Sequence, residues 1–156
     1  MTRVKGFTLV EMMVVVALLA IMASVAVPAY QSLIQNNRLS STTNALLGGL
    51  QLARSEAVTT RTSTTICGAN AAQNDCVDST AWDNGALVRQ GANLVRVIPW
   101  STGVTATSSE KSLTYNANGT AASSATVVVS DSRGASSART ITVNVIGPAC
   151  LGTPCQ

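Results

Sequence analysis

Residues 7–28 read FTLVEMMVVVALLAIMASVAVP and follow the short polar segment MTRVKG at positions 1–6. The 21 residues from Phe7 to Val27 are almost wholly apolar, and as an α-helix they would extend about 32 Å, roughly one bilayer hydrocarbon core. Glu11 is the one charged residue in this stretch. A carboxylate inside a membrane helix costs about 2.5–3.5 kcal/mol on insertion scales, so its presence points to a function.

This pattern resembles the class III signal of type IV pilins and pseudopilins. The resemblance implies that a prepilin peptidase cuts after Gly6 and that the new N-terminal residue, Phe7, is methylated. It also implies that Glu11 docks the subunit into a filament by neutralising the α-amine of Phe7 on a neighbouring subunit. Pro28 then occupies the position of the helix kink.

An ordinary secretory signal peptide is the alternative for the same segment. Arg3 and Lys5, the apolar run and the small residues at 23–26 fit that description as well. An acidic residue such as Glu11 at the start of the apolar run is unusual in a secretory signal. The small-residue stretch also lies close to Pro28, with helix-like sequence after it. These two features favour the pilin-type signal.

Length and composition beyond the apolar stretch indicate one small β-rich domain outside the cytoplasm. Only 11% of the residues are charged and 3% are aromatic, whereas Ser, Thr, Ala, Asn and Val are abundant. Without Arg3 and Lys5, the mature protein has eight basic and seven acidic residues. This near balance gives no general case for nucleic-acid binding.

The four cysteines predict disulfides in an exported domain, with three connectivities open. They fall into two local pairs, Cys67 with Cys76 and Cys150 with Cys155, and we favour pairing within each. A structural metal site would require two closely spaced cysteine pairs, usually with histidine, whereas the gaps here are eight and four residues and the sequence contains no histidine.

The helical pattern continues after the apolar stretch, over residues 29–61. Apolar and small residues recur at spacings of three and four on one helix face: Leu39, Thr43, Leu46, Leu50, Ala53 and Ala57. Pro28 lacks a backbone N–H and predicts a bend or a weak turn between the two helical halves. The Gly48-Gly49 pair predicts a second soft point, and the helix is expected to end near residues 58–61.

From residue 62 onward the pattern becomes strand-like. Strands are predicted at residues 62–67, 86–89, 94–99, 111–115, 126–130 and 139–146. Turns are expected at Asn84-Gly85, Gly91, Gly103, Asn118-Gly119 and Arg133-Gly134. Ile141, Val143 and Val145 alternate with polar residues, which is typical of a sheet with one solvated face. The predicted fold class is α+β, with a long N-terminal helix whose C-terminal half packs on an antiparallel sheet, as in the type IV pilin fold.

A second resemblance lies at residues 52–58, LARSEAV, followed by Arg61. This run is similar to the signature of the GspH/FimT/FimU-like minor pilins and pseudopilins, which cap or prime a filament. From the residues alone, we expect the small side chains of the motif to face the sheet. The charged side chains of Arg54 and Glu56 are expected to face water, with no catalytic role.

No enzyme, metal site or cofactor is predicted. The usual general base, histidine, is missing, the carboxylates are scattered, and no glycine loop that could hold phosphate precedes a helix. The resemblance leaves one binding alternative, because some FimT-like proteins bind DNA through a Gly-Arg-x-Arg motif near the C-terminus. Here that end reads IGPAC at 146–150, so Arg133 and Arg139 are the remaining candidates for DNA contact, and solvated loop charge is the favoured account.

The hypothesis is therefore a minor pilin of a Gram-negative bacterium that takes part in initiation or assembly of a type IV pilus, at or near its tip. The expected parts are a leader at 1–6, a transmembrane and filament-core helix at 7–28, an amphipathic helix at 29–61 and a β-rich head at 62–156. The expected partners are the inner membrane, a prepilin peptidase and other major and minor pilins, which would bind through the N-terminal helix. The alternatives are a type II secretion pseudopilin, a DNA-binding minor pilin for natural transformation, and a plain secreted β-domain.

Overall fold

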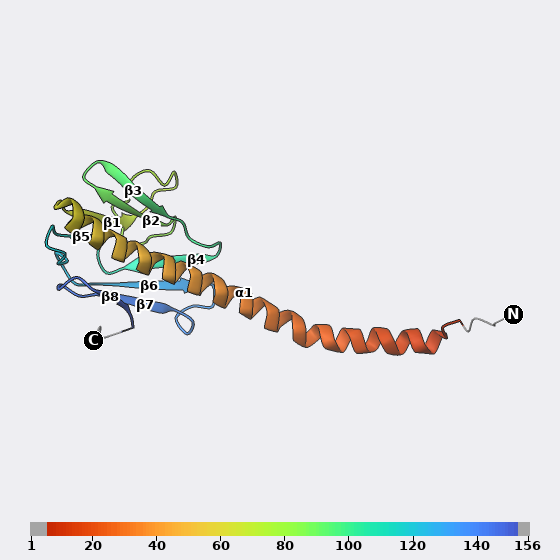
Figure 1. Ribbon diagram of the computed structural model, residues 1–156. Coiled ribbons are helices and arrows are strands. Elements are labelled where there is room, and N and C mark those ends of the chain that lie inside the picture. The colour runs from red at the N-terminus through yellow and green to blue at the C-terminus, as the bar shows by residue number, and fades with distance from the viewer. Residues whose placement is uncertain (1–5, 153–156) are drawn as a thin grey trace. The chain divides into compact units, whose positions relative to one another are not determined.

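The computed structural model describes residues 6–152 (Figure 1). The chain divides into two compact units, one up to Asn36 and one from Asn37 onward. The helix α1, Leu9–Thr60, runs through both units, and the strands belong to the second. The strands are β1 Thr64–Gly68, β2 Ala86–Gln90, β3 Asn93–Ile98, β4 Val104–Ser108, β5 Ser112–Tyr115, β6 Ala125–Asp131, β7 Arg139–Val143 and β8 Ala149–Leu151.

The predicted α+β class is confirmed, but the strands form two antiparallel sheets rather than one. The first sheet has the order β3-β2-β1-β5 and the second has the order β4-β6-β7-β8. The change of sheet occurs at β4, which follows β3 in the chain yet pairs with β6 along its whole length, from Val104 opposite Asp131 to Ser108 opposite Val127. Alternation along a strand does not reveal which strand it pairs with, so the division into two sheets was not predictable from the pattern.

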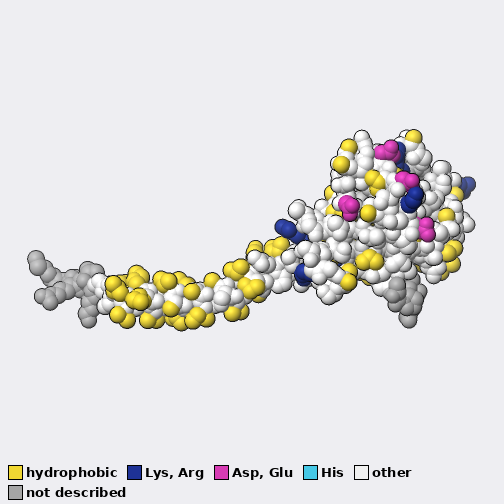
Figure 2. Space-filling view, turned by 180° about the vertical axis from the view of Figure 1, so that it is seen from behind, with side chains coloured by type: hydrophobic (Ala, Val, Ile, Leu, Met, Phe, Trp, Pro, Cys, Tyr) yellow, Lys and Arg dark blue, Asp and Glu magenta, His cyan; other side chains and the backbone are white. Residues whose placement is uncertain are grey.

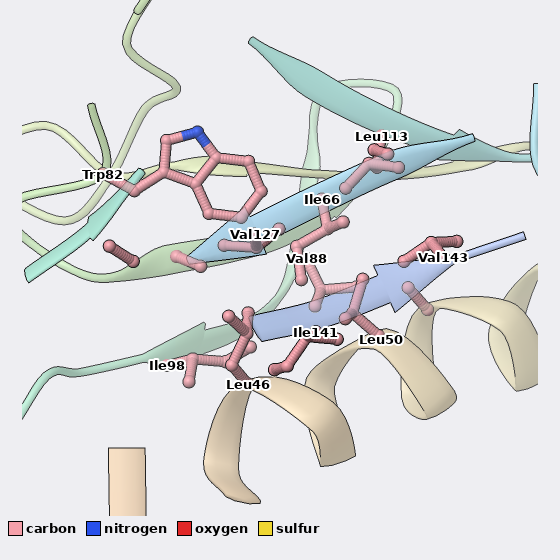
Figure 3. Close-up of a cluster of buried hydrophobic side chains, with 14 of the residues drawn as sticks. Leu46, Leu50, Ile66, Trp82, Val88, Ile98, Leu113, Val127, Ile141 and Val143 are labelled. Atoms are coloured by element: carbon pink, nitrogen blue, oxygen red, sulfur yellow. The ribbon is translucent and has the colours of Figure 1, made fainter. Parts of the chain in front are cut away.

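The helix face predicted from the spacing of three and four is confirmed as the face that packs on the sheets. Leu39, Leu46 and Leu50 are buried together with side chains from both sheets. In Figure 3, Leu46 and Leu50 point toward Val88 of the first sheet and Ile141 of the second. Burying side chains of this size contributes about 1.5–3 kcal/mol each, so this stripe holds the head together.

The strand predictions were correct for six strands and missed β4 and β8. In β4, only Val104 and Ala106 are apolar, and the alternation is carried partly by the buried hydroxyl residue Ser108. The β8 strand has three residues and gives too short a pattern to recognise. The last long strand was predicted to run to residue 146, but β7 ends at Val143, and Val145 is exposed.

The predicted pairing of Cys67 with Cys76 is confirmed by a disulfide between them. The bond closes the loop after β1, which is held further by an ion pair between Arg89 and Asp75. Cys155 lies outside the described residues, so its pairing with Cys150 stays a prediction. No cysteine among residues 6–152 is a free thiol.

The two adjacent glycines of α1 differ in their surroundings. A Cβ at Gly49 would lie 2.0 Å from Cδ1 of Ile98 in β3, whereas a Cβ at Gly48 would meet nothing within 4 Å. Gly49 is buried in the interface between α1 and β3, so the soft point predicted there is a close-packed contact. Gly48 is exposed, and no neighbouring atom prevents a larger residue at this position.

Alanine at these two positions should therefore change stability in opposite directions. Gly48→Ala should raise the free energy of unfolding by about 1 kcal/mol, because alanine favours the helix and meets no obstacle. Gly49→Ala should lower the free energy of unfolding below the wild-type value by about 1–3 kcal/mol, because the added methyl group overpacks the core. Urea unfolding of the purified protein measures both values.

A double variant tests the cause of the Gly49→Ala loss. Ile98→Val removes Cδ1, the atom that the new methyl group would strike, so Gly49→Ala should cost less in the Ile98→Val background than in the parent. Additive costs in the double-mutant cycle would contradict the assigned contact.

Candidate functional site

The N-terminal unit presents an apolar surface along α1 from Leu9 to Leu33. Its aliphatic and methionine side chains are exposed, and Figure 2 shows them covering this part of the helix. Within the described residues, α1 is the one helix long and apolar enough to cross a membrane. Large apolar patches on a protein surface mark places where another protein or a membrane binds.

The start of α1 is fixed by a local hydrogen bond between Thr8 and Glu11. The backbone N–H of Glu11 donates to Oγ1 of Thr8 over 3.2 Å, so Thr8 caps the helix that begins at Leu9. Thr8 and Glu11 also have the spacing of a capping box, in which an acidic residue in the first turn supports the cap. The backbone of Glu11 thus takes part in a helix cap that we did not anticipate, although the T-x-x-E pattern was visible in the sequence.

Glu11 has no ion pair with any residue that the structure describes. Its position in the first turn of α1 places a carboxylate at the positive end of the helix dipole, which is a favourable location. In an apolar environment such as a membrane or a helix bundle, a single carboxylate still requires a positive partner. The favourable position in the first turn therefore explains the acidic residue only in part.

Gly6 and Phe7 precede the helix and are accessible. Both residues are exposed, Phe7 to 69%, and a Cβ at Gly6 would meet no atom within 4 Å. The peptide bond between them is outside regular secondary structure. The rest of the predicted leader, residues 1–5, lies outside the described residues.

Pro28 lies inside α1, which continues through it as one helix from Leu9 to Thr60. The hydroxyl of Ser32 donates to the carbonyl of Pro28 over 2.8 Å. Because proline has no N–H, the carbonyl of Ser24 lacks its usual helical donor, and a bend at this point stays a prediction.

In the second unit, Arg54 of the LARSEAV run connects α1 to two distant loops. Its Nε donates to the carbonyl of Gly119 over 2.9 Å, and its Nη2 donates to the carbonyl of Ile146 over 3.3 Å. The expectation that this side chain simply faces water was wrong. The small residues of the run behave as predicted, since Ala53 and Ala57 are fully buried.

The two loops can approach Arg54 closely because each has a glycine, Gly119 or Gly147, at the point of contact. Gly119 adopts a positive φ in the predicted Asn-Gly turn, and Gly147 does so in the turn before β8. A Cβ at Gly147 would lie 2.1 Å from the carbonyl oxygen of Gly119 and 2.7 Å from Nε of Arg54. Arg54 thus binds both loops at a point where no larger residue fits.

Tyr115, at the end of β5, is buried beside this arginine. Its hydroxyl has no hydrogen-bond partner among residues 6–152. Burial raises the pKa of Tyr115 to about 12, and the positive charge of Arg54 opposes that shift. The phenol therefore stays protonated and neutral at physiological pH.

The two arginines considered for DNA contact, Arg133 and Arg139, differ in whether an acidic residue neutralises them. Arg133 forms an ion pair with Asp131, with Nη2 2.6 Å from Oδ2, and its hydrogen bond holds the pKa of Asp131 below the usual range. Arg139 is exposed at the start of β7 and has no acidic partner among the described residues. With Arg133 already neutralised, this part of the head has one uncompensated arginine rather than a basic patch.

Two family models match the chain. The model described as type II transport protein GspH matches residues 42–147, which is more than half of the chain. The model of the prokaryotic N-terminal methylation motif matches residues 1–27. The first match includes Arg54 and the two loop residues that it binds, Gly119 and Ile146, and the second covers Gly6, Phe7 and Glu11.

Individual relatives match over shorter stretches. The fimbrial protein EcpC of Eikenella corrodens is 46% identical over 52 residues, which make up 33% of this chain and 33% of that protein. The type IV major alpha-pilin of Moraxella bovis is 41% identical over 49 residues, 31% of each protein. The chain thus matches about a third of the length of these relatives.

Similar solved structures show the same fold. A crystal structure of the type IV minor pilin FimU of Pseudomonas aeruginosa aligns with a TM-score of 0.60 at 22% identity, covering 76% of this chain and 90% of the FimU chain in the crystal. A second crystal form of FimU aligns with a TM-score of 0.59 at 24% identity, covering 72% and 91%.

The buried Tyr115 hydroxyl predicts a loss of stability at alkaline pH. Because its pKa is higher in the folded state than in the unfolded state, the contribution of this group is complete below about pH 10. It is lost as the pH rises from about 10 toward 12, because the unfolded state then loses its proton first. Tyr115→Phe should keep the neutral-pH melting temperature within a few degrees, since the hydroxyl that it removes is unpaired.

Melting temperatures of both proteins at pH 8, 9.5 and 11 provide the test. The melting temperature of the wild-type protein should fall more steeply between pH 9.5 and 11 than that of Tyr115→Phe. Equal slopes would show that Tyr115 ionises as freely in the folded state as in the unfolded state.

Proposed function

We propose that this chain, which belongs to the GspH family and has the fold of a type IV minor pilin, takes part in the assembly of a type IV pilus as a subunit at or near its tip. In this proposal the protein is processed after Gly6, methylated at Phe7 and held in the inner membrane by residues 7–28. It then enters the filament through the same helix. Its role is structural rather than catalytic.

The observation that carries this proposal is the apolar surface of α1 from Leu9 to Leu33. Its large apolar side chains are 41% to 76% exposed. Burying one such side chain completely is worth about 1.5–3 kcal/mol, so this length of helix strongly favours an apolar environment. A bilayer provides that environment before assembly, and the helices of neighbouring pilins provide it afterwards.

Glu11 gives the second step of the proposal. Cleavage after Gly6 creates the α-amine of Phe7, which is a cation within the same apolar surroundings. A carboxylate and an amine from adjacent subunits compensate each other there, whereas either alone is strongly unfavourable. The pair thus selects one register between neighbouring helices rather than adding much stability.

A type II secretion pseudopilus is the second candidate, because the matched family model is described as a type II transport protein. The fold of FimU and the fimbrial relatives favour the pilus. Deletion of the gene distinguishes the two: lost piliation and twitching with normal exoprotein secretion supports the pilus, and the reverse supports the pseudopilus.

Substitutions at Glu11 test the docking role separately from the local cap. Glu11→Gln retains a residue that suits the third position of a capping box but removes the charge, whereas Glu11→Val removes both. Both variants should insert into the membrane as well as wild type or better, since a costly charge is gone. Both should be depleted from sheared filaments, because the amine of a neighbouring subunit loses its partner.

Immunoblots of membranes and sheared filaments measure the two steps. If Glu11→Gln assembles like wild type and Glu11→Val does not, Glu11 acts through the helix start and the charge pairing is wrong. If both variants assemble normally, Glu11 has no docking role.

A further inference from the structure

The guanidinium of Arg54 is a partly buried cation that has no anionic partner among residues 6–152. Two of the five N–H donors of an arginine are used here, both by backbone carbonyls of the loops at Gly119 and Ile146. The other three have no partner among residues 6–152. Carbonyl oxygens fix the position of the side chain but do not neutralise its charge.

The carboxylates of the described residues are either engaged elsewhere or not bonded to Arg54. Asp75 pairs with Arg89, Asp78 with Lys111 and Asp131 with Arg133. Glu56 is two residues from Arg54 on α1, and side chains at that spacing point in different directions. Within the described part of the chain, Arg54 thus has no carboxylate partner, although three other cations do.

Arg54 faces an open groove of about 360 Å³. The groove runs along the last turns of α1 and is lined on the helix by Gln51, Ser55 and Val58, and on the opposite side by the Asn118-Gly119 turn. Its polar side chains can donate hydrogen bonds, and Val58 is 49% exposed. Ile146, whose carbonyl binds Arg54, is 66% exposed.

We propose that this groove receives a carboxylate-bearing segment of a neighbouring pilin subunit, with the carboxylate bound to the free edge of Arg54. Guanidinium and carboxylate form bidentate, charge-assisted hydrogen bonds, and arginine flanked by apolar residues is typical of the energetic centres of protein interfaces. This inference rests on the proposed function, because it requires that the protein have neighbours in a filament.

A protein segment fits this groove better than a nucleic acid does. Nucleic-acid backbones are bound by several cations, because every nucleotide has a phosphate. Among the described residues that line the groove, Arg54 is the one cation. The exposed apolar side chain of Val58, which lines the groove, suits the side chains of a peptide.

The experiment introduces an internal competitor for the partner's carboxylate. Gln51 lies three residues before Arg54 and lines the same groove, so Gln51→Glu places a carboxylate within reach of the guanidinium. The fold should be as stable as wild type or slightly more stable, which a melting curve checks. Ser41→Glu is the matched control, because Ser41 is exposed on α1 outside the groove and the substitution changes the net charge equally.

A photo-crosslinking residue at Ser55 in the full-length protein reports on occupancy of the groove in piliated cells. We expect a crosslink to another pilin subunit, mapped by peptide mass spectrometry to a segment with an aspartate, a glutamate or a terminal carboxylate. The yield should fall by about tenfold or more with Gln51→Glu and stay unchanged with Ser41→Glu.

Several outcomes would overturn the inference while leaving the proposed function intact. These are an incorporated subunit with no crosslink, a crosslink unaffected by Gln51→Glu, a crosslinked segment without a carboxylate, and a crosslink to nucleic acid. Absence of the wild-type protein from filaments would instead refute the proposed function and this inference together.

Discussion

The burial of one stripe of α1 against both sheets is the interaction on which the rest of the head depends. Leu39, Leu46 and Leu50 join a single core with side chains from strands of both sheets. Because the sheets have no strand in common, this helix is their shared packing surface. Gly49 lets α1 approach β3 closely, and Arg54 binds the loops that lead to β6 and β8. A change in the stripe therefore affects both sheets at once.

In the N-terminal part of α1 the apolar residues are distributed differently around the helix. There the apolar residues surround the helix rather than forming one stripe, and none of the most apolar stretch is buried within the protein. A helix that is apolar on all sides is buried in a membrane or among other helices. The head thus completes its fold within one chain, whereas the N-terminal part of α1 requires partners outside it. This division is what makes an assembly role the natural proposal for a member of the GspH family.

Much of the fold could be predicted because its signals are periodic. The stripe of α1 shows a helical repeat, and six of the strands are short runs of apolar and β-branched residues between turn signals. The two-sheet arrangement could not be predicted, since the pairing of β4 with β6 rather than with its neighbours in sequence has no local signature. The buried face of β4 also includes Ser108, and serine is more typical of loops than of buried strands. In the candidate sites too, contacts between residues close in sequence could be predicted, and contacts between distant residues could not. The cap between Thr8 and Glu11 was recognisable, since the two residues are three positions apart. The role of Arg54 was not, because its partners are backbone carbonyls 65 and 92 residues away, and every residue has a carbonyl.

The mature N-terminus is the most direct test of the proposed filament role, because both the proposed membrane helix and the proposed docking of Glu11 depend on where the protein is cut. Intact-mass and N-terminal peptide mass spectrometry of the protein purified from its native membranes would measure it. We predict that the mature protein begins at Phe7 and has one added methyl group. A mature protein that begins near Ala26 or Val27 would mean that the apolar helix is removed as an ordinary secretory signal, and it would contradict the filament role.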